Sequence, residues 1–98
     1  MEEVPCFFAV FGLPKPTYEH AKIVDVIREA SGGDFKQFPV PGGIGFVFAT
    51  NIKPWNLSFD RVLLNGDTVF ITEITRGSFV QRGFGAASGW INTHFPRD

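Results

Sequence analysis

An apolar run between two prolines is the feature that most constrains the start of this chain. Residues 6–13, between Pro5 and Pro14, read CFFAVFGL and carry no charged side chain. Proline cannot donate to a sheet ladder, so the two prolines mark the ends of the run. A short aromatic-rich segment bounded in this way is typical of a buried strand. We therefore predict a first strand over residues 6–13.

The following segment has the periodicity of an amphipathic helix. Over residues 18–31, one side at 100° per residue contains His20, Ile23, Val24, Val26, Ile27 and Ala30. Thr17 suits the N-cap, and Glu19 suits the positive end of the helix. Gly32 and Gly33 suit a left-handed C-cap. This helix is expected to lie on an apolar surface.

A hairpin, a second helix and another strand are predicted next. Residues 34–40 and 43–50 flank the turn signal Pro41-Gly42-Gly43. Pro54 suits the first turn of a helix, and residues 68–74 are rich in β-branched side chains. The apolar side of the second helix should contain Trp55, Phe59, Val62 and Leu63.

The order strand, helix, hairpin, helix, strand predicts an α+β fold, a ferredoxin-like βαββαβ sandwich with an antiparallel sheet. We expect one domain, with its core over about residues 6–75 and a C-terminal extension over residues 76–95. Residues 78–81 could form a fifth, edge strand. A short final helix, weakened by three glycines, would place on one face Ala87, Trp90, Ile91, His94 and Phe95.

Both faces of the sheet are predicted to be apolar, because the first strand places Phe7 and Phe11 on one side and Phe8 and Val10 on the other. Large exposed apolar patches are uncommon on monomers. The second face could be covered by a second copy, by the tail, or by nucleobases stacked on aromatic rings. A homodimer is favoured because symmetric pairs are the commonest oligomers. The candidate dimer face consists of Phe7, Phe11, Phe46 and Phe48.

Charge and cysteine content argue against several classes of function. Nine basic and ten acidic residues give a net charge of −1, without the basic excess of most nucleic-acid-binding domains. The single cysteine, Cys6, excludes an internal disulfide and offers no metal-ligand spacing. We expect no metal site and no cofactor. No apolar run is long enough to cross a bilayer and the N-terminus does not resemble a signal peptide, so we expect a cytoplasmic protein without a membrane partner.

No residue is assigned a catalytic role from the sequence. His20 lies on the apolar side of the first helix, where a hydrogen-bonded core histidine is commoner than a general base. Neither His20 nor His94 has a cysteine or carboxylate at a ligand spacing. Glu73 shares a strand face with Val69 and Ile71, where it could be catalytic or could guard the strand end.

Residues 76–84 interleave arginine, phenylalanine and glycine, which suits phosphate contact combined with base stacking. An edge segment kept soluble by arginine is the alternative interpretation. The candidate nucleic-acid-binding residues are Lys15, Arg76, Arg82, Phe79 and Phe84.

Three features resemble one family of small proteins. They are the first strand FAVFGL leading into a proline-bearing loop, the segment LNGDTVFITEI over residues 64–74, and the closing Trp90-Ile91. Together they resemble the superfamily of the small CRISPR-associated endoribonuclease and virulence-associated protein D, including its short relatives. The resemblance implies a ferredoxin-like homodimer. The active nucleases of that group carry an aspartate at the end of the first strand, where this sequence has Gly12, so the resemblance does not extend to catalysis.

Three functional hypotheses follow. The first is a small dimeric module, non-catalytic and associated with RNA or DNA, in a toxin–antitoxin or defence setting. The second is a protein–protein interaction module whose partner pairs with an open sheet edge or covers the apolar face. The third is a small-substrate enzyme of the dimeric α+β type, with His20 and Glu73 as its acid–base pair.

Overall fold

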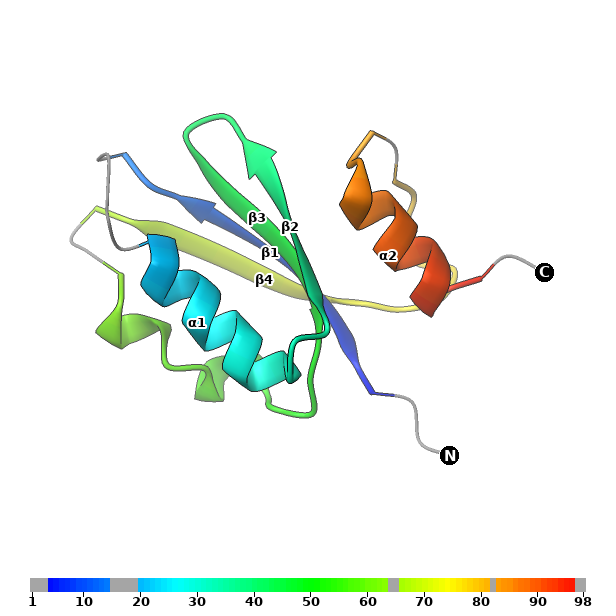
Figure 1. Cartoon of the computed structure of the whole chain (residues 1–98), viewed down its shortest axis with the longest axis horizontal. Helices are drawn as coiled ribbons and strands as arrows, with labels where there is room; N and C mark the ends of the chain where they lie inside the picture. Colours follow the sequence, from blue (N-terminus) through cyan, green and yellow to red (C-terminus); the bar gives the residue numbers. More distant parts are fainter. Residues whose placement is uncertain (1–3, 15–19, 64–65, 82, 97–98) are drawn as a thin grey trace.

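One antiparallel sheet forms the centre of the protein. The computed structural model describes residues 4–14, 20–63, 66–81 and 83–96. The strands are β1 (Cys6–Gly12), β2 (Phe35–Val40), β3 (Gly43–Ala49) and β4 (Thr68–Ile74), and the helices are α1 (His20–Ser31) and α2 (Ala86–His94). The strand order is β2-β3-β1-β4, with every neighbouring pair antiparallel. The sheet passes between the two helices (Figure 1). The predicted α+β class is confirmed.

Helix α1 covers one face of the sheet with the side that the periodicity predicted. Ile23 and Ile27 are buried there. The helix ends at Ser31, whose hydroxyl donates to the Ile27 carbonyl at 2.7 Å. Gly32 has a φ of +63°, and the Gly33 N–H donates to the Arg28 carbonyl at 3.1 Å, which is the predicted glycine cap. The expected N-cap residues lie outside the described part of the chain.

The four phenylalanines assigned to the dimer face are core residues instead. All four are at most 4% exposed and belong to the cluster beneath α1: Phe7, Phe11, Phe46 and Phe48. Phe7 stacks on Phe48, and Phe11 meets Phe46 edge-on, with ring centroids 5.6 and 5.8 Å apart. They have no exposed surface to offer a second copy, so the dimer-face assignment is wrong. The alternation of a strand that is apolar on both sides does not indicate which face the helix will cover.

Two short 3-10 turns replace the second predicted helix. They span Pro54–Asn56 and Phe59–Arg61. Between them Leu57 is extended, with φ −75° and ψ 136°, and packs against the first core. Leu57 occupies the inward position expected for Trp55, whose side chain is 79% exposed. Phe59 is buried as predicted, where its ring packs edge-on against that of Phe11 at 5.0 Å.

The C-terminal tail covers part of the second face of the sheet. Residues 78–81 form no strand, contrary to the expected edge strand, but α2 forms and packs over β2 and β3 (Figure 1). The second core contains Cys6, Phe38, Val47, Ala49, Ile74, Ala87, Trp90 and Ile91. Of the three expected covers, the tail is therefore the one present within a single chain.

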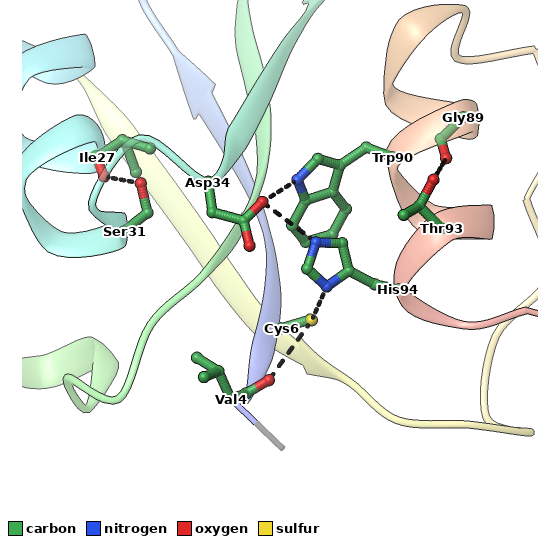
Figure 2. A network of polar contacts seen from close by, with 9 residues as sticks. All are labelled: Val4, Cys6, Ile27, Ser31, Asp34, Gly89, Trp90, Thr93 and His94. Carbon is green, nitrogen blue, oxygen red and sulfur yellow. Dashed lines mark hydrogen bonds and ion pairs between the residues drawn. The ribbon is translucent and has the colours of Figure 1, made fainter. Parts of the chain in front are cut away.

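A carboxylate at the start of the hairpin holds α2 in place. The Trp90 indole Nε1 donates to Asp34 Oδ1 at 2.9 Å, and His94 Nε2 lies 3.2 Å from the same oxygen (Figure 2). The Trp90 and His94 rings are stacked with centroids 4.0 Å apart. Asp34 precedes β2, so these contacts tie the end of the tail to the sheet.

Candidate functional site

Strand β4 presents an edge that the described residues leave open. It pairs on one side with β1, and no strand among the described residues pairs with its other side. A strand edge carries unpaired N–H and C=O groups that can accept another strand. β4 is seven residues long, which is enough for a ladder of backbone hydrogen bonds with a partner.

The opposite edge of the sheet is protected, and this contrast makes β4 the candidate site. β2 contains Lys36 and Pro39 and lies beneath α2. Lysine and proline are two of the devices with which proteins block edge pairing. β4 has neither lysine nor proline, and Glu73 is its one charged residue.

The face of β4 that points to the α2 side is also exposed. Phe70 is 69% exposed, although it stands in register with Val10 at the centre of the sheet. Beside it a groove of about 290 Å³ runs between β4 and the tail. We call this hollow the β4 groove; the residues that line it include Phe8, Thr72, Ile74, Phe79, Val80 and Phe84.

The structure brings some of the candidate nucleic-acid-binding residues together. Phe79 lines the β4 groove and also, with Arg76, an adjacent hollow of about 200 Å³. Phe79 is 38% exposed and packs edge-on against Phe95 at 5.3 Å. Lys15 and Arg82 lie outside the described residues.

Phe84 is a packing residue more than a stacking platform. Its ring meets Phe38 edge-on at 5.0 Å and Phe8 at 6.0 Å. Arg76 is exposed and donates to the Pro96 carbonyl at 3.0 Å, which leaves other guanidinium donors for a ligand. Among the described residues, Glu73 also lines the β4 groove, and no lysine or arginine does.

The other residues considered from the sequence form no visible site. His20 is the first residue of α1 and Glu73 is exposed on β4; the suggested acid–base pair stays a prediction. Gly12 is the last residue of β1, and a Cβ built there would lie 2.5 Å from Thr68 Oγ1. An aspartate at this position would therefore require Thr68 to move.

Two features were missed by the sequence analysis. The first is the contrast between the two edge strands, for which the lysine and proline of β2 gave the signal. The second is the proximity of Cys6, His94 and Asp34, which a single sequence does not reveal because Cys6 and His94 are 88 residues apart. No group of three metal-binding side chains occurs within the described ranges, and none of the helices described there is long and apolar enough to cross a membrane.

Comparison with known proteins adds no relative. A scan against protein-family models finds no match, and searches of curated proteins and of solved structures find no significant match. The geometry of β4 and of the groove beside it is therefore what indicates a function.

Proposed function

We propose that this protein is a dimeric binding module in which two copies join along β4. The observation that carries the proposal is the unprotected β4 edge, with Phe70 exposed beside it. The strand order, 2-3-1-4 with antiparallel neighbours, supports a ferredoxin-like assignment in which a pair of 3-10 turns stands in place of the second helix. The toxin–antitoxin or defence setting stays a prediction from the resemblance.

Antiparallel pairing of β4 with β4 of a second copy would form backbone hydrogen bonds and would also place compatible side chains opposite each other. In a register centred on Ile71, Phe70 lies opposite Thr72 of the second copy, and Glu73 lies opposite Val69. Like charges directly opposite each other destabilise a strand pair, and this register avoids them. The two sheets would merge into one, and both exposed edges would be removed.

The dimer would also place two binding grooves on one surface. A two-fold axis between antiparallel edge strands runs perpendicular to the sheet, so the same face of each copy points the same way. Both β4 grooves would then lie on one side, close to the junction. Because most of the residues that line each groove are apolar, an apolar segment of a partner protein is the ligand that its chemistry favours.

The test is solution mass measured by light scattering over a dilution series. We expect a species near twice 10.9 kDa, which converts to monomer in the double variant Phe70→Lys/Thr72→Lys. In the dimer that variant places lysine opposite lysine, whereas in the monomer both positions are exposed. Val80→Lys is the matched control, because Val80 is 93% exposed and lies off the strand. A wild-type monomer at every concentration would refute the pairing.

Nucleic-acid binding is the second candidate, favoured by the shared hollow of Arg76 and Phe79. Its test is binding of single-stranded RNA and DNA over a series of salt concentrations. A phosphate contact through Arg76 predicts affinity that falls with salt, and Phe79→Ala should weaken binding by about 1–3 kcal/mol if a base stacks on that ring. Absent binding at low salt would remove this candidate and leave the protein-partner proposal unaffected.

A further inference from the structure

A cysteine, a histidine and a carboxylate form a continuous polar chain at the end of α2. Cys6 Sγ lies 3.7 Å from His94 Nδ1, and His94 Nε2 lies 3.2 Å from Asp34 Oδ1 (Figure 2). The three residues come from β1, from α2 and from the segment before β2. A nucleophile next to a base that is itself oriented by a third group is the arrangement by which proteins activate thiols.

Asp34 determines which His94 nitrogen faces the thiol with a lone pair. The Trp90 indole Nε1–H can only donate a hydrogen bond, so Asp34 Oδ1, which lies 2.9 Å away, is its acceptor. The same oxygen then accepts from His94 Nε2–H. In neutral His94 the proton therefore sits on Nε2, and Nδ1 faces Cys6 Sγ as an acceptor; the thiol also lies 3.7 Å from the Val4 carbonyl, to which it can donate instead. Stacking on Trp90 holds the ring plane in this orientation.

A cavity borders both Cys6 and His94. Cys6 is 5% exposed, and a buried cysteine is usually an inert core residue. Here, however, both Cys6 and His94 line a hollow of about 390 Å³, within the size range of small-ligand sites. Its other walls include Pro5, Ile74 and Phe95. Glu73 and Arg76 also border the hollow, and the Arg76 guanidinium donates to the Pro96 carbonyl at 3.0 Å.

We propose that Cys6 and His94, positioned by Asp34, form a nucleophilic thiol site that accepts a short acyl group from a thioester. Cys6 Sγ attacks the carbonyl carbon and passes its proton to His94 Nδ1. The new Sγ–C bond forms as the C–S bond of the thioester breaks, and the departing thiolate takes the proton from Nδ1. The products are S-acyl Cys6 and a thiol, with no oxidant or reductant consumed. In this step Cys6 and His94 are the reacting residues, and Asp34 is a positioning residue.

The experiment follows acetylation of the full chain by S-acetyl-N-acetylcysteamine with intact-mass detection. Because Cys6 is the one cysteine of the chain, the thiol adduct is site-specific, and Cys6→Ser supplies the blank. We expect the folded protein to react at least about tenfold faster than the same chain unfolded in urea, since general-base assistance contributes about 10²–10⁴-fold when fully expressed. If the folded wild-type protein reacts more slowly than the unfolded chain, that result alone overturns the proposal, and no variant is needed.

Variants separate activation from simple packing by the sign of their effect. His94→Ala removes the ring that packs beside Cys6. If His94 were only a packing residue, the thiol would become more accessible and acetylation would be faster. If His94 is the base, the rate should be at least about tenfold lower. Asp34→Ala should also slow the reaction, and Asp34→Asn should retain the rate because its amide oxygen still accepts from Nε2–H. Gly89→Ala lies on the same helix but outside the cavity wall, where an added Cβ meets no other side chain, so this control should leave the rate unchanged. An unchanged or faster His94→Ala variant would contradict the assignment.

Discussion

The ring of Phe38 lies directly over Gly45, its cross-strand partner in the hairpin, and leaves no room there for a Cβ. Phe38 is 2% exposed and also packs against Phe8 and Phe84. Gly45 is therefore a packing requirement, and the Phe38 ring connects the hairpin to the tail.

The first prediction concerns Gly45→Ala. The added methyl must displace the Phe38 ring, and overpacking of this kind costs about 1–3 kcal/mol of the free energy of unfolding. Urea denaturation followed by far-UV circular dichroism measures the loss. A Gly45→Ala protein as stable as the wild type would mean that the ring can move aside at no cost.

Gly89→Ala is predicted to have the opposite effect. Gly89 lies within α2, and a Cβ built there has no heavy atom within 4 Å, apart from its chain neighbours and the helix backbone. Alanine should therefore stabilise the helix by about 0.5–1 kcal/mol. The same denaturation measurement applies, and a destabilised variant would argue that α2 is not helical at this position.

A third prediction tests the two 3-10 turns against the helix that the sequence suggested. Trp55→Ala should change stability by less than about 0.5 kcal/mol, because the side chain is 79% exposed. Phe59→Ala should cost about 3–5 kcal/mol, because Phe59 is buried in the first core. A large loss of stability in Trp55→Ala would indicate that the amphipathic helix forms as the sequence predicted.

The buried hydroxyl of Thr50 provides the fourth prediction. Thr50 is 3% exposed; its Oγ1 donates to the Ala30 carbonyl at 2.7 Å and accepts from the Ile52 N–H at 3.0 Å. Thr50→Val keeps the shape but leaves both backbone groups without this partner, which should cost about 1–3 kcal/mol. Thr50→Ser, which retains the hydroxyl, is the control and should lose less in thermal denaturation.

Strong local patterns account for the parts of the fold that the sequence predicted. The prolines around β1, the glycines after α1, the turn at residues 41–43 and the β-branched run of β4 each specify one element, and each element lies where expected. Periodicity alone could not decide between Trp55 and Leu57 for the inward position, because one extended residue between two turns changes which side chain faces the core.

The candidate site was predictable only in part. The β4 edge follows from the strand order, and the composition of residues 76–84 indicated an aromatic surface near an arginine. That Phe84 is used for packing, and that Cys6 meets His94, depends on how the tail folds back on the sheet. These are contacts between distant segments, for which a single sequence carries no local signal.

The second core can form only after α2 has been translated, because it joins β1 to α2. β1 is synthesised before α2, yet the side of it that carries Cys6 and Phe8 packs against α2 and the residues beside it. During translation the sheet can close over α1 while its other face stays bare until residues 86–94 have left the ribosome. For that interval the nascent protein exposes an apolar surface that chaperones can recognise, and the docking of a single short helix then completes the second core.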